Sequence, residues 1–115
     1  MANQQVLDEL FQALADPTRR SVLEQLGTGP ASTSELASHF EMALPSFTRH
    51  LDVLDRCGLV TSQKEGRVRT YQLLPAGLEP AEHWLTTQHR LWTRRLDQLD
   101  SLLTAIGLTD PEETS

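Results

Sequence analysis

One stretch of the chain, residues 44–56 (LPSFTRHLDVLDR), constrains the fold more than any other. At about 100° per residue, its large apolar side chains fall in a single sector of a helix. That sector holds Leu44, Phe47, Leu51 and Leu54, and the opposite sector holds Pro45, Ser46, Arg49, Asp52, Val53 and Arg56. The pattern predicts a helix that packs on a core through one face and presents the other face to a partner.

The segments on both sides of this helix carry the signals of a helix-turn-helix followed by a β-hairpin. Ser32 and Glu35 have the spacing of a capping box, which predicts the start of a short helix. Gly58 can supply the left-handed cap that ends the longer helix. The predicted elements are a helix over 32–40, a turn at 42–44, a helix over 44–57, and strands at 59–64 and 67–74 joined at Glu65-Gly66. Together they form a winged helix-turn-helix.

This arrangement predicts double-stranded DNA as the partner. A helix about 10–12 Å wide fits the major groove, where Arg and Ser side chains can read base edges. We expect Ser46 and Arg49 to face the bases, whereas Pro45 either contacts a thymine methyl or only starts the helix. The structural alternative for Arg49 is an exposed ion pair with Asp52 or Asp55, worth about 0–1 kcal/mol. The predicted DNA-binding residues are Ser32, Ser34, Pro45, Ser46, Thr48, Arg49, His50, Lys64, Arg67 and Arg69.

Several members of this set also have a structural explanation. Ser32 and Ser34 cap a helix first and contact phosphate second. Thr48 lies toward the flank of the helix, where a phosphate contact is expected. His50 lies at the edge of the inner face, which favours a structural role or a phosphate contact over catalysis. For the basic tip of the hairpin, contact with the minor groove or with phosphate competes with simple solvation.

The segments outside the motif read as helices. Residues 3–15 have apolar side chains at helical spacing, and Asp16-Pro17 then supplies an N-cap and a first helical position for a second helix over 17–26. A final helix is expected over about 78–106. The predicted fold is therefore mainly α, with five helices and a small β-hairpin wing.

The final helix carries more apolar surface than a small domain needs. Leu85, Trp92, Leu96, Leu99, Leu103 and Ile106 follow steps of seven, four, three, four and three, the period of a seam between helices. A single recognition helix also reads too few base pairs for useful specificity, whereas a two-fold dimer reads two half-sites. We expect a homodimer that forms through the terminal helices. Its predicted interface residues are Leu7, Leu10, Leu85, Trp92, Leu96, Leu99 and Leu103.

The formal net charge of −6 is unevenly distributed. Residues 44–70 hold five basic and three acidic side chains, whereas residues 1–43 and 71–115 each have a net charge of −4. Because exposed charges more than about 8 Å apart are largely screened at physiological salt, the local potential at the docking face decides affinity for DNA. We expect a site-specific binder with weak non-specific affinity.

The chain length, the lengths of the apolar runs and the cysteine content exclude several classes of protein. The 115 residues suffice for one domain, expected over 1–108 and followed by a disordered acidic tail at 109–115. No apolar run approaches the roughly 18–20 residues of a membrane helix, and MANQQVLDEL does not resemble a signal peptide. The lone Cys57 rules out an internal disulfide and fits a reducing compartment. We expect a cytoplasmic protein without membrane contact.

Four ordered motifs resemble the ArsR-type transcriptional regulators. They are LFQALADPTRRSVLEQL at 10–26, ELASHF at 35–40, MALPSFTRHLDVLDRCGLV at 42–60 and EGRVRTYQL at 65–73, within a similarity that extends over about residues 5–106. The resemblance implies a homodimeric winged-helix repressor that binds an imperfect palindrome at its own promoter. Many such proteins leave DNA when a metal or another inducer binds, so an unidentified small-molecule effector stays open.

The sequence departs from the metal-sensing branches of that family. One branch uses a Cys-x-Cys pair in the helix before the recognition helix, but SELASH at 34–39 contains no cysteine. Another uses a carboxylate and three histidines on the final helix. Here Glu82, His83 and His89 are present, but the two histidines are six residues apart and do not share a helix face. We expect no metal and no cofactor, as in the metal-independent branch.

Two rival functions remain. The first is a protein-interaction module that has the winged fold but does not bind DNA, which would explain the negative net charge of the chain. Arg49, Arg67 and Arg69, expected on one face, argue against that alternative. An enzyme is remote, because the sequence contains no phosphate-binding loop, no paired carboxylates in an apolar setting and no nucleophile–base pair.

Overall fold

The computed structural model describes residues 2–108, with side chains from Gln4 onward. The chain divides into two compact units, residues 1–81 and 82–115. The expected disordered tail at 109–115 lies outside the described residues, so it stays a prediction. Within residues 2–108, no helix combines the length and the apolar character needed to cross a membrane.

The first unit contains four helices and a three-stranded sheet. In chain order its elements are α1 (Ala2–Ala15), α2 (Pro17–Leu26), β1 (Ala31–Ser32), α3 (Thr33–Ala37), α4 (Leu44–Arg56), β2 (Val60–Glu65), β3 (Val68–Leu73) and the 3₁₀ turn η1 (Pro75–Leu78). The helix α5 (Glu79–Ala105) starts in this unit and supplies most of the second. The predicted winged helix-turn-helix with five helices is confirmed.

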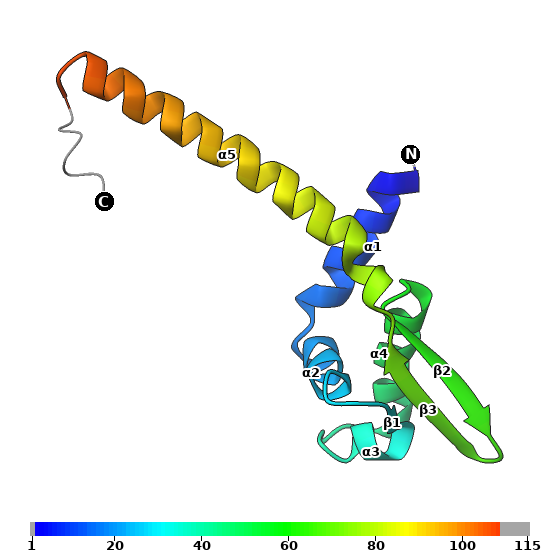
Figure 1. Ribbon diagram of the computed structural model, residues 1–115. Coiled ribbons are helices and arrows are strands. Elements are labelled where there is room, and N and C mark those ends of the chain that lie inside the picture. Colours follow the sequence, from blue (N-terminus) through cyan, green and yellow to red (C-terminus); the bar gives the residue numbers. More distant parts are fainter. Residues whose placement is uncertain (1, 109–115) are drawn as a thin grey trace. The chain divides into compact units, whose positions relative to one another are not determined.

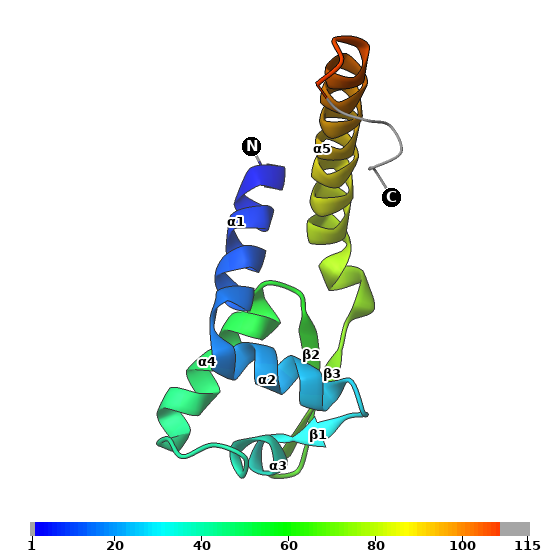
Figure 2. The same ribbon diagram turned by 90° about the vertical axis from the view of Figure 1, so that its left-hand side faces the viewer.

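Figure 2 shows α1 at one end of the first unit and α3 at the other, with α2 between them. The hairpin of β2 and β3 extends beyond α4, and its turn is at the free end (Figure 1). Both views place the N-terminus of α4, the helix α3 and the free end of the hairpin at the same end of this unit.

The sheet has one strand more than the predicted hairpin. The short strand β1 pairs antiparallel with β3, so the strand order is β1-β3-β2. Ala31 lies opposite Tyr71 and Ser32 lies opposite Thr70. Two residues carry no alternation that a sequence pattern could detect. This strand ties the helix-turn-helix to the hairpin.

The core of the first unit is made by the faces that the sequence pattern assigns to the interior. Fully buried side chains come from α1, α2, α3, α4 and β2. They include Leu10, Val22, Leu36, Phe47, Leu51, Leu54 and Val60. Leu10 was predicted at the dimer interface, and that prediction is wrong, because its side chain is already completely enclosed within one chain.

Two arginines at the start of α2 bind the C-terminal end of α1. Arg19 donates from Nε to the carbonyl oxygen of Ala13 and from Nη2 to that of Gln12, both at 2.9 Å. Arg20 donates from Nη1 to the carbonyl oxygen of Leu14 at 2.8 Å. The last carbonyls of a helix have no intrahelical partner, so these guanidinium groups satisfy them.

Arg19 also reaches α4. Nη1 of Arg19 lies 3.1 Å from Nδ1 of His50. Nδ1 of His50 also lies 3.7 Å from Oδ2 of Asp16, the N-cap of α2. One polar cluster therefore links α1, α2 and α4.

The chain passes unusually close to itself where η1 meets the turn after α4. A Cβ built on Gly77 would collide with the carbonyl oxygen of Gly58 and would lie 2.8 Å from its carbonyl carbon. Because these atoms belong to the backbone, no side-chain rotation can make room. Gly58 itself has φ +77° and forms the predicted left-handed cap of α4.

Gly77→Ala is expected to lower the free energy of unfolding by about 3 kcal/mol, the upper end of the usual range for overpacking. Gly66→Ala is the matched control, since φ there is +63° but nothing lies within 4 Å of a Cβ. The control should cost about 1–2 kcal/mol through backbone strain alone. Urea unfolding at one fixed protein concentration measures both. Equal losses would contradict the close approach.

The pKa of Asp16 is lower than its ordinary value. Partial burial raises it, but the hydrogen bond from the backbone N–H of Arg19 and the charges of His50 and Arg19 outweigh that effect. A carboxyl whose pKa is depressed by folding stabilises the protein above its unfolded pKa, and that stability is lost as the pH falls.

Asp16→Ala should cost about 1 kcal/mol at pH 7 through the lost helix cap. Asp16→Asn keeps a capping side chain but cannot ionise. The difference in unfolding free energy between wild type and the Asn variant should therefore shrink as the pH falls through the ordinary value of 3.8. Urea unfolding at pH 7, 5 and 3 measures this difference. A difference that grows on acidification would contradict the assigned sign.

Candidate nucleic-acid interface

The rotation of α4 is fixed by three side chains that are completely buried. Phe47, Leu51 and Leu54 are each 0% exposed, which leaves the predicted outer face in solvent. Pro45, Ser46, Arg49, Asp52 and Arg56 are all exposed there, whereas Val53 is half-buried against the core. The inner and outer faces of this helix are therefore as predicted, apart from Val53 and Leu44.

Leu44 was predicted on the inner face, and that prediction is wrong. Its side chain is 56% exposed. The ring of Phe40, which follows α3, packs against Phe47 with the ring centroids 5.1 Å apart. Phe40 thus packs beside Phe47, whereas Leu44 lies in solvent at the first residue of α4.

Arg49 makes no hydrogen bond or ion pair with any residue that the structure describes. The alternative pairing with Asp52 or Asp55 is not formed. An exposed guanidinium with five donors and no internal partner is available for an external acceptor. Ser46 lies beside it, also exposed.

Two other candidates on α4 are engaged within the protein. The hydroxyl of Thr48 donates to the carbonyl oxygen of Pro45 at 3.0 Å, which leaves its oxygen lone pairs for an external donor. His50 is turned toward Asp16 and Arg19, as described above, so its ring belongs to the cluster that positions α4. The structure thus separates His50 from the exposed outer face.

The N-terminus of α4 carries no side-chain cap. Ala43 occupies the N-cap, as the sequence predicts, and makes no side-chain hydrogen bond. The first backbone N–H groups of the helix are therefore open to an external acceptor, and a helix N-terminus favours a negative charge.

The hairpin presents three cations at its free end. Gly66 has φ +63° and Arg67 follows it in the two-residue turn, which fits a type II′ hairpin. Lys64 lies directly opposite Arg69, so these two side chains share one face of the ribbon. Arg69 also donates from Nη1 to Oγ of Ser62 at 2.8 Å. Two like charges face each other here, an arrangement that costs stability unless an anion lies nearby.

The serines at the start of α3 form the predicted capping box. Oγ of Ser32 accepts from the backbone N–H of Glu35 at 3.1 Å, and Oε1 of Glu35 accepts from the N–H of Ser32 at 3.0 Å. These bonds lower the pKa of Glu35. Ser34 is exposed on the same turn, and its side chain makes no hydrogen bond to any residue that the structure describes.

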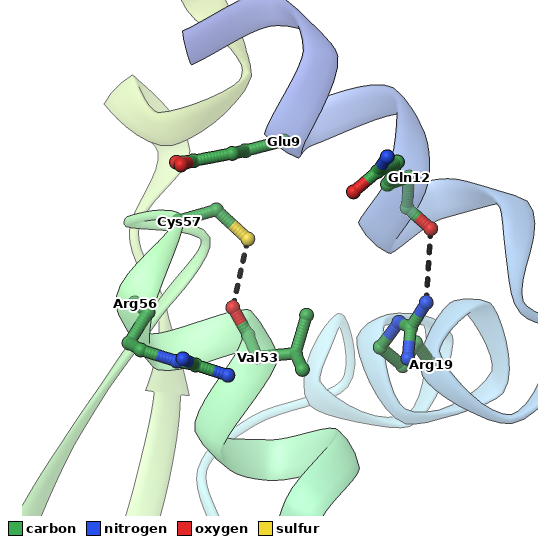
Figure 3. Close-up of a pocket in the computed structure, with 6 residues that line it drawn as sticks. All are labelled: Glu9, Gln12, Arg19, Val53, Arg56 and Cys57. Atoms are coloured by element: carbon green, nitrogen blue, oxygen red, sulfur yellow. Dashed lines mark hydrogen bonds between the residues drawn. The ribbon is translucent and has the colours of Figure 1, made fainter. Parts of the chain in front are cut away.

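A pocket of about 310 Å³ lies between α1 and the C-terminal half of α4. Figure 3 shows Glu9 and Gln12 on one side and Val53, Arg56 and Cys57 on the other. The thiol of Cys57 donates to the carbonyl oxygen of Val53 at 2.8 Å, and burial raises the pKa of this thiol. It therefore stays protonated at neutral pH. Among the described residues, no three His, Cys, Asp or Glu side chains are grouped to hold a metal ion.

The second unit is described through residue 108 and consists mainly of α5. Its predicted seam is solvent-exposed within one chain: the exposed fractions of Leu85, Trp92, Leu96 and Leu99 are 53%, 63%, 65% and 51%. Leu103 is half-buried, as is Leu7 on α1. Four large apolar side chains in one helical sector remain uncovered.

Comparison with known proteins gives consistent matches. A model of a helix-turn-helix domain matches residues 14–63. The HTH-type transcriptional regulator Rv2034 of Mycobacterium tuberculosis is 39% identical over 100 residues, which cover 87% of this chain and 91% of that protein. The transcriptional repressor SdpR of Bacillus subtilis is 29% identical over 79 residues, covering 69% and 88%.

Solved structures agree with these relatives. The crystal structure of an ArsR family transcriptional regulator has a TM-score of 0.76 and 48% identity, and the match covers 78% of this chain and 93% of that one. Fold, motif order and relatives all lead to one assignment. This chain belongs to the ArsR family of winged helix-turn-helix transcriptional regulators.

Proposed function

We propose that this protein is a homodimeric repressor that binds a two-fold symmetric DNA site near its own promoter. The observation that carries the proposal is the exposed, unpartnered Arg49 on a recognition helix whose rotation is fixed by three buried side chains. The uncapped N-terminus of α4 and the basic end of the hairpin lie at the same end of the first unit, as Figures 1 and 2 show.

The interface residues divide into two roles. Ser46 and Arg49 face outward in the first turns of α4, the part of a recognition helix that enters the major groove. Lys64, Arg67 and Arg69 provide charge for phosphates or for the minor groove. Ser34 and Thr48 are further phosphate donors or acceptors on the flanks. The repressor role rests on likeness to a relative that bears that name, and the geometry of the site offers no catalytic group.

Arg49→Ala should cost about 1–3 kcal/mol of binding free energy at the preferred sequence and should reduce discrimination between sequences. Arg49→Lys is the matched control, because it keeps the charge but not the two-donor fork. It should retain the salt dependence and lose base preference. Arg69→Ala should weaken all sequences alike and lower the salt slope by about one. Fluorescence anisotropy with duplexes from the upstream region, at several salt concentrations, measures each effect.

A failure of wild-type protein to bind any upstream duplex at low salt would favour the alternative function. The chain would then be a protein-interaction module on a winged-helix scaffold, a role that its acidic net charge suits. Equal discrimination by wild type and Arg49→Ala would leave DNA binding intact and remove Arg49 as the reader of bases.

The dimer is proposed to form through the exposed seam of α5. Trp92 and Leu96 are the most exposed large apolar residues of the seam, at 63% and 65%. Burial of such side chains against a second copy would stabilise the pair through the hydrophobic effect, at about 25 cal/mol per Å². Leu7 on α1 is half-buried and can still contribute, whereas Leu10 cannot.

The double variant Trp92→Glu, Leu96→Glu should be monomeric in sedimentation velocity experiments, because a dimer would have to bury charged side chains in the seam. The matched control is the double variant Thr86→Glu, Ser101→Glu, at exposed positions on the side of the same helix away from the seam. The control should remain dimeric and keep its affinity for DNA. Monomers that bind the full site as tightly as wild type would contradict the two-half-site argument.

A further inference from the structure

The first residue of the recognition helix is an exposed leucine. Leu44 is 56% exposed, whereas Phe40 packs against Phe47 in the neighbouring core. Its neighbour Pro45 is exposed as well. A single exposed leucine is ordinary on a protein surface. Leu44, however, lies at the end of α4 that is proposed to enter the DNA groove, so it is a candidate for contact with the bases.

The direction of the side chain follows from helix geometry. Every Cα–Cβ bond in an α-helix tilts toward the N-terminus. At the first helical position this tilt carries the side chain toward the N-terminal end of α4. In helix-turn-helix proteins the N-terminal residues of the recognition helix contact base edges. Leu44 therefore lies at the end of α4 whose residues contact base edges in such proteins, in the sector that also holds Phe47.

Base edges in the major groove carry one apolar group, the 5-methyl of thymine. All other groups there are hydrogen-bond donors or acceptors, which a leucine cannot satisfy and would desolvate. We propose that Leu44 is a specificity-determining residue that contacts a thymine methyl in each half-site. The inference rests on the proposed DNA binding and adds that one fixed position of each half-site is an A·T pair with its thymine facing Leu44.

The test removes only the methyl group. Once footprinting has defined a bound duplex, each thymine of the protected region is replaced in turn by deoxyuridine. At one position per half-site, wild-type protein should lose affinity by about fourfold, the equivalent of one buried methylene-sized group. Leu44→Ala should bind the thymine and uracil duplexes equally at that position. Because Leu44 is exposed, the Ala variant should keep the unfolding free energy of wild type.

Pro45→Ala is the matched variant, since Pro45 is the exposed apolar residue that directly follows Leu44 in α4. It should retain the full sensitivity to uracil. If sensitivity disappears in Pro45→Ala and persists in Leu44→Ala, Pro45 reads the methyl and the inference about Leu44 is wrong. If no uracil substitution affects wild-type binding, the inference is wrong although DNA binding stands. If wild type binds no duplex at all, the proposed function itself fails.

Discussion

The burial of Phe47, Leu51 and Leu54 is the constraint on which the rest of the site depends. Each is completely enclosed, and a rotation of α4 by one residue would turn about 100° of its surface from core to solvent. Such a rotation would expose Phe47 and bury the polar side of the helix, a change that costs several kcal/mol. The outward direction of Arg49 is therefore fixed by the core and not by any contact that Arg49 makes.

A second constraint sets where α4 lies relative to the first two helices. Arg19 binds two carbonyls at the end of α1 and Nδ1 of His50 on α4. Asp16 caps α2 and lies beside the same ring. Hydrophobic packing has no direction, whereas these hydrogen bonds have defined geometry. The core thus fixes the rotation of α4, and the polar cluster fixes its register against α1 and α2.

Much of this fold could be predicted from local sequence patterns. The two wrong predictions, for Leu44 and Leu10, share one cause. The capping box at Ser32, the Asp16 cap and the left-handed Gly58 all depend on residues close in sequence, and all are present. Leu44 and Leu10 were misplaced because periodicity assigns a residue to a sector but cannot say whether the core extends that far. Leu44 lies beyond the edge of the core at the first residue of α4, whereas Leu10 is enclosed by the other elements of the core.

The polar cluster escaped prediction for a related reason. Arg19 has acidic neighbours in sequence, so a surface ion pair is the simplest local expectation. The guanidinium instead binds carbonyls six and seven residues earlier and a histidine 31 residues later. A clue was present in the chain, because α1 runs into Asp16-Pro17 without a glycine to cap its last carbonyls. Unpaired backbone groups at a helix end require a partner, and an arginine in the next helix can be that partner.

The acidic net charge and the few basic side chains at the candidate interface together indicate how this protein binds DNA. The exposed cations of α4 and the hairpin are few: Arg49 and Arg56 on the helix and Lys64, Arg67 and Arg69 on the hairpin. The surrounding chain is negative and repels a phosphate backbone that lacks the right geometry. Few phosphate contacts also mean a small gain from counterion release. Affinity must then come from contacts to base edges, and a protein built in this way should discriminate strongly between sequences while it binds random DNA weakly.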